Sequence, residues 1–376
     1  MFNVMYRLNR NIKQKLSSLF KLTFLIAMCL LLFSGCKKLY NLPDEKEYLS
    51  GKIDYSNKII EPVIGRWNLH GGINIDNSSL PLKFEIVNAR YGDGRPVTDI
   101  FQVRPTYVWI AAYDGLETSL EEIEAKRKIE DHPIFEVRES GEFILWPSAT
   151  NELLEPRPSD SSNLAQDTRF FDLKISNTGG EIILKDFQLR PWREREYYPD
   201  NDINHYTGEV RRDPRDPFNP NRRDYIRPWL DNVIGANTLK SLVSNDDKKD
   251  AVVYIRRFEG GNGHNLRFKV LDTDSVPMNP ALFNETKWEE MVHGFNMEIT
   301  DEYVQYDVAY PIPLVSALNT KYASGGNAHA NIRYSRRGFG GDLTTGAFGV
   351  DFRIYRPGDW EIVFHFKNDN PKFEDE

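Results

Sequence analysis

The sequence predicts a mostly β protein, built as tandem immunoglobulin-like β-sandwich domains with a few short helices. Apolar and polar residues alternate in many short segments, for example at Val304, Tyr306, Val308 and Tyr310, and this period of two is typical of strands with one buried face. Turns rich in Gly and Pro separate these segments, and the sequence lacks the strand–helix alternation that builds parallel sheets. Many short strands with such turns favour antiparallel sandwiches.

Four pairs of these segments are close enough in the sequence to be predicted as β-hairpins. They are residues 134–137 with 143–146, 173–175 with 182–184, 252–258 with 266–270, and 350–354 with 360–366. Each connection contains turn-forming residues, such as Ser140-Gly141 in the first. Three tryptophans inside strand patterns are predicted core residues: Trp109, Trp146 and Trp360.

Two short helices are predicted from capping boxes. In residues 119–130, Ser119 and Glu122 form the box, and Glu124 and Lys128 are spaced for an ion pair. Residues 286–293 carry a second box. Both helices are amphipathic and are expected to cover a sheet edge.

The N-terminus has the layout of a secretory signal. Residues 1–35 contain five basic residues and no acidic one, and the apolar run over 22–33 is too short to span a bilayer. Small residues then precede Cys36, which resembles the bacterial lipobox, except that Phe33 stands where Leu is usual. The resemblance implies cleavage before Cys36 and acylation of its thiol. The alternative is an uncleaved signal or membrane anchor in which Cys36 has no role.

Charge and cysteine content limit which classes of ligand and which covalent or metal cross-links are expected. The chain has 48 Lys+Arg, 56 Asp+Glu, a net charge of −8 and two cysteines. Loss of residues 1–35 would remove five positive charges and Cys29, which leaves −13 and no free thiol once Cys36 is acylated. Disulfides and thiolate zinc sites are thereby excluded. The negative charge argues against nucleic acid and against acidic polysaccharides as main partners. By resemblance, Lys37 and Lys38 after the cysteine favour the outer membrane, with the face left open.

Composition also suggests the domain boundaries. The predicted parts are a lipoprotein signal peptide over 1–35, a lipidated tether over 36–58, an N-terminal β-sandwich domain over 59–190, a connecting segment over 191–247 and a C-terminal β-sandwich domain over 248–376. The connecting segment stands out because residues 190–228 hold nine arginines, eight acidic residues and six prolines. A connection of this length is usually functional or a linker.

The connecting segment also supplies the candidate ligand site. Flat aromatic rings beside planar polar groups are suited to sugars, and sites often lie between domains. The predicted glycan-binding residues are Trp192, Tyr197, Tyr198, Trp229, Arg193 and Asp200. The alternative is that these rings pack the connection onto its neighbouring domains.

Motifs for catalysis are not found. The sequence has no phosphate-binding Gly-rich loop ending in Gly-Lys-Ser/Thr, no Gly-x-Ser-x-Gly elbow and no His-Glu-x-x-His helix. Asp200, Asp202 and Asn204 resemble the start of a calcium loop, but His205 and Arg211 depart from it. We therefore predict no catalytic residue, no metal site and no cofactor, while a pair of carboxylates for glycoside hydrolysis stays open.

Several segments resemble an uncharacterised family of Bacteroidota lipoproteins that carries a domain of unknown function. These segments are residues 48–50, 54–57, 61–66, 81–86, 119–128, 310–314 and 355–362. The resemblance implies export, an outer-membrane setting and tandem β-domains. It also implies association with starch-utilisation-type uptake systems, which pair a TonB-dependent porter with a lid lipoprotein. It supplies no catalytic residues.

These observations predict a non-catalytic outer-membrane lipoprotein, working as a glycan-binding or accessory component of a polysaccharide-uptake system. Its expected partners are membrane lipid through Cys36, a glycan, and the porter with its lid lipoprotein. One alternative is a structural subunit that packs against the porter complex. The other is a glycan-active hydrolase.

Overall fold

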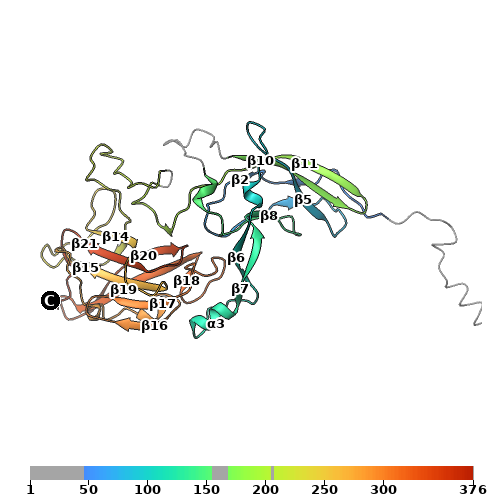
Figure 1. The fold of residues 1–376 in the computed structure, drawn as a ribbon. Coiled ribbons are helices and arrows are strands. Elements are labelled where there is room, and N and C mark those ends of the chain that lie inside the picture. The colour runs from blue at the N-terminus through green and yellow to red at the C-terminus, as the bar shows by residue number, and fades with distance from the viewer. Residues whose placement is uncertain (1–45, 155–167, 205–206, 376) are drawn as a thin grey trace, which may run out of the picture.

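The chain folds into two β-rich lobes that lie end to end (Figure 1), which confirms the mostly β prediction. The computed structural model describes residues 46–154, 168–204 and 207–375. The predicted signal peptide and Cys36 lie outside these residues. Within the described ranges, no helix has the length and apolar character that a bilayer span requires. The N-terminal lobe takes its core from residues 53–189 and the C-terminal lobe from residues 197–366.

The N-terminal lobe is built on a four-stranded sheet in the order β2-β11-β10-β5. Its strands are β2 (Ile59–Ile60), β5 (Lys83–Tyr91), β10 (Arg169–Asn177) and β11 (Gly180–Leu189). Opposite lies a small sheet in the order β3-β9-β8, formed by β3 (Asn68–His70), β8 (Phe135–Val137) and β9 (Phe143–Leu145). The β8–β9 and β10–β11 pairs confirm two of the predicted hairpins. Aromatic rings from both sheets fill the space between them.

Part of the predicted tether belongs to this lobe. Ile53 and Tyr55 are buried in its core, and β1 (Asp54–Tyr55) pairs with β4 (Ile73–Asn74). The chain reaches the lobe at the turn between β10 and β11, where the amide of Asn177 donates to the Tyr48 carbonyl at 3.1 Å. The described chain therefore begins at the tip of that hairpin.

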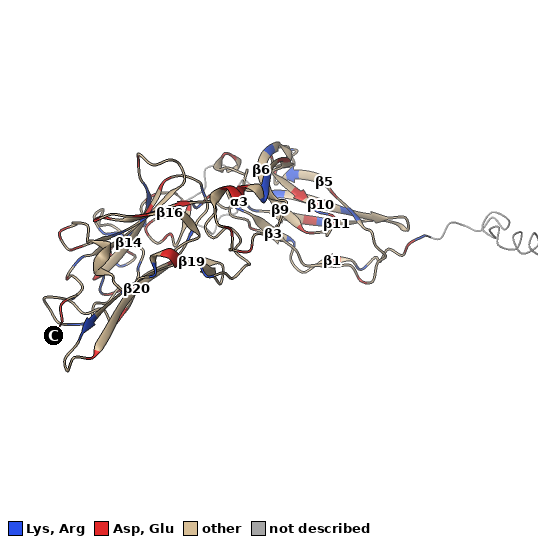
Figure 2. Ribbon diagram, turned by 90° about the horizontal axis from the view of Figure 1, so that it is seen from below, with Lys and Arg blue, Asp and Glu red and all other residues tan. Residues whose placement is uncertain are grey.

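A two-stranded arm reaches from the N-terminal lobe to the C-terminal lobe. It consists of β6 (Val103–Trp109), α3 (Leu120–Ala125) and β7 (Arg127–Pro133), and both views place α3 at the junction of the lobes (Figures 1 and 2). Ser119 caps α3 as predicted by accepting from the Glu122 amide at 3.2 Å.

The predicted extent of that helix is wrong. The helix ends at Ala125 instead of residue 130, because residues from Arg127 onward pair with β6. The expected Glu124–Lys128 ion pair is therefore absent from the described contacts: Glu124 pairs with Arg127, and Lys128 pairs with Glu130 at 2.6 Å.

The C-terminal lobe has two facing sheets. The first has the order β14-β21-β15-β17-β16, and the second has the order β12-β20-β19-β18, with β13 also paired to β20. Ring contacts such as Phe348–Phe364, at 5.3 Å, join the two sheets. The strands of the first sheet are β14 (Ala251–Arg257), β15 (Asn265–Leu271), β16 (Gly294–Ile299), β17 (Val304–Val308) and β21 (Trp360–Phe366). Those of the second are β12 (Tyr197–Tyr198), β13 (Trp229–Asp231), β18 (Ala323–Ser324), β19 (Asn327–Arg337) and β20 (Leu343–Ile354).

Two predicted hairpins of this lobe are wrong. Strands β14 and β15 do not pair with each other, because β21 lies between them, antiparallel to β14 and parallel to β15. Strands β20 and β21 lie in different sheets, so residues 355–359 cross from one sheet to the other. Period-two patterning identifies a strand with a buried face but does not identify its partner. Parallel pairs also occur, since β2 runs parallel to β11.

Two smaller expectations are also corrected. Residues 286–293 form a single 3-10 turn at Trp288–Glu290. The hydroxyl of Thr286 instead donates to the Arg333 carbonyl at 2.9 Å, which places this segment on the edge of β19. Trp146 and Trp360 are buried, whereas Trp109 is only half-buried.

Most of the connecting segment packs on the C-terminal lobe. Tyr197, Ile226, Val233 and Leu242 belong to its core, and β12 and β13 extend the edge of β20. Side chains also tie the lobes together: Arg356 pairs with Glu194, and Arg127 donates to the Tyr310 carbonyl at 2.6 Å. The immunoglobulin-like arrangement stays a prediction.

Candidate functional site

The outer face of the sheet containing β19 and β20 gathers polar and aromatic side chains in rows. Along β20, Val350, Phe352 and Ile354 are buried, so the residues that alternate with them face outward. Pairing with β19 sets polar residues beside those outward positions. We call this surface the outer face; its members are Tyr198, Trp229, Ser324, Asn327, His329, Asn331, Gly349, Asp351 and Arg353.

Trp229 is the larger of the two aromatic side chains of the outer face. Its side chain is 40% exposed, and its backbone lies opposite Gly349 in the β13–β20 pair. The neighbouring Leu230 packs against the core and so directs Trp229 outward. A Cβ at Gly349 would lie 2.5 Å from the indole, so the ring occupies the space that a side chain would need. Glycine thus allows the indole to lie close against the sheet.

Tyr198 and Arg353 form the next aromatic and polar group of the outer face. Tyr198, 43% exposed, lies opposite Arg353 in the β12–β20 pair. The Arg353 guanidinium lies 5.7 Å from the Tyr198 ring centre, and its Nε donates to Asn327 Oδ1 at 2.7 Å. The guanidinium is thereby held against the sheet.

Between these two groups lies a chain of hydrogen bonds. His329 Nδ1 is 2.8 Å from Asp351 Oδ1, and His329 Nε2 is 2.8 Å from Ser324 Oγ. Since an ionised Asp351 only accepts, Nδ1 carries the proton and Nε2 accepts from the serine hydroxyl. The order of groups is that of a Ser-His-Asp trio. Ser324 and Asp351 are exposed and His329 is half-buried.

The structure brings only part of the predicted site together. Tyr198 and Trp229 share the outer face. Tyr197 is buried, because its ring packs on Trp360 at 5.8 Å and its hydroxyl donates to Asp202 at 3.1 Å; burial also raises the pKa of Tyr197. Its ring faces the core and cannot contact a ligand.

The other three predicted residues lie elsewhere. The Trp192 amide donates to the Pro62 carbonyl of the N-terminal lobe at 2.8 Å, so its backbone is fixed there. Arg193 follows it and is half-buried. Asp200 Oδ2 lies 3.4 Å from Arg195 Nε. The set of predicted residues lacks Ser324, His329, Asp351 and Arg353, because their proximity depends on strand pairing.

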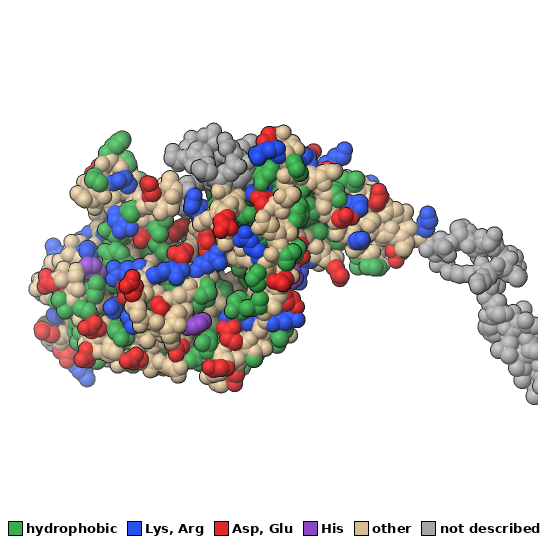
Figure 3. All heavy atoms as spheres, viewed as in Figure 1, with side chains coloured by type: hydrophobic (Ala, Val, Ile, Leu, Met, Phe, Trp, Pro, Cys, Tyr) green, Lys and Arg blue, Asp and Glu red, His purple; other side chains and the backbone are tan. Residues whose placement is uncertain are grey.

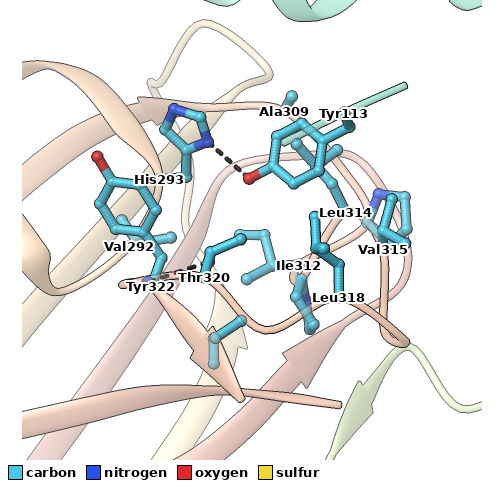
Figure 4. Close-up of a pocket in the computed structure, with 14 residues that line it drawn as sticks. Tyr113, Val292, His293, Ala309, Ile312, Leu314, Val315, Leu318, Thr320 and Tyr322 are labelled. Atoms are coloured by element: carbon cyan, nitrogen blue, oxygen red, sulfur yellow. Dashed lines mark hydrogen bonds between the residues drawn. The ribbon is translucent and has the colours of Figure 1, made fainter. Parts of the chain in front are cut away.

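A small apolar pocket lies where the arm meets the C-terminal lobe. Figure 4 shows Tyr113 of the arm facing His293, with aliphatic side chains such as Leu314 and Leu318 on one side. His293 Nε2 donates to the Glu117 carbonyl at 2.8 Å, and Nδ1 accepts from the Tyr113 hydroxyl at 2.6 Å. Burial lowers the pKa of His293, which favours this neutral form. Because these polar groups hydrogen-bond one another, we interpret the pocket as the contact through which the arm packs on the C-terminal lobe.

In the described ranges, no three His, Cys, Asp or Glu side chains are grouped in a way that could hold a metal ion. Asp202, one of the residues that resembled a calcium loop, accepts from Tyr197.

Comparison with known proteins gives a family but no activity. The family model described as Domain of unknown function (DUF5007) matches residues 73–375, which comprise the N-terminal lobe from β4 onward and the described C-terminal lobe. No curated protein matches the chain.

Proposed function

Because the chain belongs to the DUF5007 family, whose function is unknown, we propose its role from the outer face: it is a glycan-binding accessory lipoprotein of a polysaccharide-uptake system. The proposal includes export, acylation at Cys36 and residence at the outer membrane, where a TonB-dependent porter and its lid lipoprotein would be its partners. It also holds that the protein is not an enzyme.

The position of Trp229 is the observation that carries the proposal. An indole 40% exposed on the outer face, lying over Gly349, offers an apolar surface to one face of a sugar ring. Planar hydrogen-bonding groups lie beside it, since Asn331 is opposite Gly349 on β19. Such a combination of apolar surface and oriented polar groups is typical of ligand sites.

The course of the chain agrees with a lipid anchor. Residues 47 and 48 contact the β10–β11 turn, and β11 runs from that turn toward the C-terminal lobe (Figure 1). Its ten residues extend about 33 Å at the usual rise of a strand. An anchor preceding residue 46 would thus leave the outer face on the lobe away from the membrane.

We expect Trp229→Ala to weaken glycan binding roughly tenfold or more, because truncation of an aromatic anchor typically costs about 2 kcal/mol. Isothermal titration of the purified protein against malto-, xylo- and manno-oligosaccharides measures the effect. Trp67→Ala is the matched control, since Trp67 is also 40% exposed but lies on the N-terminal lobe. No binding by the unaltered protein, or equal affinity of both variants, would contradict the proposal.

The Ser324–His329–Asp351 trio supports a second candidate, hydrolysis of ester groups on a glycan. The Ser324 oxygen would attack the ester carbonyl carbon while His329 Nε2 takes its proton. When the carbon–oxygen bond to the sugar breaks, His329 returns that proton to the sugar oxygen. Water, deprotonated by His329, then releases the acid and restores Ser324. We place this candidate second because the trio lies on an open face, whereas such chemistry needs oriented donors for the oxyanion in a site shielded from bulk solvent.

Release of acetate from acetylated xylo-oligosaccharides tests this candidate. It predicts release by the unaltered protein, loss with Ser324→Ala, and retention with Ser335→Ala. Ser335 is a suitable control because it lies on β19, the strand that carries His329, and contacts Asn284 and Glu285 instead of a histidine. Absence of acetate release, or equal release by both variants, would eliminate the hydrolase and leave the binding role.

A further inference from the structure

Three arginines lie together where the N-terminal lobe meets the outer face. Arg66, from the loop between β2 and β3, places its guanidinium carbon 4.6 Å from the ring centre of Tyr355, just after β20. Arg353 lies two residues before Tyr355. Arg195 lies two residues before β12. The carbonyl of Glu196, the residue between Arg195 and β12, accepts from the Tyr355 amide at 2.8 Å. We call Arg66, Arg195 and Arg353 the arginine cluster.

The three positive charges affect one another. The pKa of Arg66 is lowered, first by burial and further by the like charges of Arg195 and Arg353. Arginine nevertheless stays protonated at all physiological pH values. The protein therefore tolerates mutual repulsion among these side chains.

Only one member of the arginine cluster has an ion-pair partner in the part of the chain that the structure describes. Arg195 Nε lies 3.4 Å from Asp200. Arg66 contacts the Tyr355 ring, and Arg353 contacts the Tyr198 ring and the amide of Asn327. The guanidinium groups of Arg66 and Arg353 thus have donors left for an anion.

Acidic residues close by are engaged elsewhere. Glu196 pairs with Arg257 at 2.7 Å, and Glu194 pairs with Arg356. Asp351 accepts from His329 at 2.8 Å. Arg66 and Arg353 are thus left without a matching carboxylate among the described residues, and such guanidinium groups are suited to carboxylate or sulfate ligands, which they bind through paired N–H donors.

We propose that the arginine cluster binds an acidic group, a carboxylate or a sulfate ester, on a glycan whose sugar rings lie along the outer face toward Trp229. This inference rests on the proposed glycan-binding role and gives the class of ligand. Arg353 and Gly349 are four residues apart on β20, about 13 Å at the rise of a strand. That spacing suits a short acidic oligosaccharide.

The local charge at the arginine cluster is positive, whereas the net charge of the chain, which argued against acidic polysaccharides, is negative. Net charge governs long-range attraction, but a groove or face lined by one sign attracts the opposite charge locally. The charge of the chain is unevenly distributed: on the face seen in Figure 3, basic side chains form a row across the C-terminal lobe, although the chain as a whole carries −8.

Titration of the unaltered protein with paired probes tests the proposal. Oligogalacturonate and its methyl ester differ in the carboxylate, and a sulfated galactan oligosaccharide and its desulfated form differ in the sulfate. We expect at least one acidic probe to bind roughly tenfold more tightly than its neutral partner, with an affinity that falls as salt rises. The two pairs distinguish a carboxylate from a sulfate ester.

Substitutions locate the site. Arg353→Gln and Arg66→Gln should each remove most of the preference for the acidic probe, whereas Arg138→Gln should keep it. Arg138 is a matched control because its substitution removes the same charge from an exposed turn of the N-terminal lobe. Thermal unfolding checks that each variant is folded. If Arg66→Gln does not fold, Arg353→Gln, at the edge of the outer face, tests the proposal by itself.

The outcomes separate this inference from the role on which it rests. Equal binding of acidic and neutral probes that depends on Trp229 would overturn the anion site and support the glycan-binding role. Acidic binding that depends on Arg353 but not on Trp229 would support the anion site and contradict the role proposed for the indole. Failure of every probe to bind would overturn both.

Discussion

We expect Phe143→Ala to lower the free energy of unfolding of the N-terminal lobe by about 3–5 kcal/mol, the usual cost of deleting a buried phenylalanine ring. Phe143 is 0% exposed, and its ring centre lies within 5.4–5.7 Å of four others: Tyr55, Phe135, Phe171 and Phe187. These rings come from both sheets of the lobe and from its first strand. The cavity would therefore lie where three parts of the lobe meet.

Urea unfolding followed by tryptophan fluorescence measures this effect. Phe218→Ala is the control, since Phe218 is 95% exposed and its loss should change stability by less than about 0.5 kcal/mol. A Phe143→Leu variant should lie between the two, because it leaves a smaller cavity. A Phe143→Ala variant as stable as the control would show that this cluster does not hold the lobe together.

The second large effect is expected for Asp369→Ala in the C-terminal lobe. The buried Asp369 carboxylate accepts from the Asn237 side-chain amide at 3.0 Å, the Thr238 amide at 2.8 Å and the Thr238 hydroxyl at 2.7 Å. These bonds fix the turn at residues 235–238 to the segment after β21. Alanine would leave several donors unsatisfied, at about 1–3 kcal/mol each, so we expect a loss of about 3 kcal/mol or more.

The same residue makes a pH prediction. Burial raises the pKa of Asp369, but hydrogen bonds from Thr238 and Asn237 outweigh burial and leave the pKa below its ordinary value of 3.8. The stabilisation from this ionised group is therefore complete above about pH 4 and is lost as the pH falls through the folded-state pKa.

Acid unfolding of the two proteins checks the prediction. The stability difference between the unaltered protein and Asp369→Ala should shrink below pH 3.8. Asp274→Ala, at an exposed position, should match the unaltered protein throughout. A difference that stays constant with pH would mean that Asp369 is not stabilised in its ionised form.

The strands of this protein can be predicted from its sequence much better than their partners. The β8–β9 and β10–β11 hairpins were predicted correctly because a short turn determines each pairing locally. The partners of β14 and β15 depend on β21, about 100 residues away, and no local pattern indicates it. Helix α3 ends early for a related reason: pairing with β6 overrides the helical propensity of residues 126–130.

In the candidate site, too, local features could be predicted from the sequence but contacts between distant segments could not. The clustering of aromatic residues in the sequence pointed to Tyr198 and Trp229, which share the outer face. It could not separate them from Tyr197, because alternation along a two-residue strand decides which ring is buried. The contact between His329 and Asp351 depends on strand register, and the approach of Arg66 depends on the docking of the lobes, so neither could be derived from spacing.

The placement of β21 between β14 and β15 has a consequence for synthesis. Strand β14 ends at Arg257, but its only antiparallel neighbour in the described sheet begins at Trp360. A ribosome must add about 100 further residues before the first sheet of the C-terminal lobe can close. Until then the edges of β14 and β15 that face β21 are unpaired, and exposed edges of this kind favour aggregation. Chains truncated before residue 360 should therefore aggregate more readily than the full chain, even when their N-terminal lobe is folded.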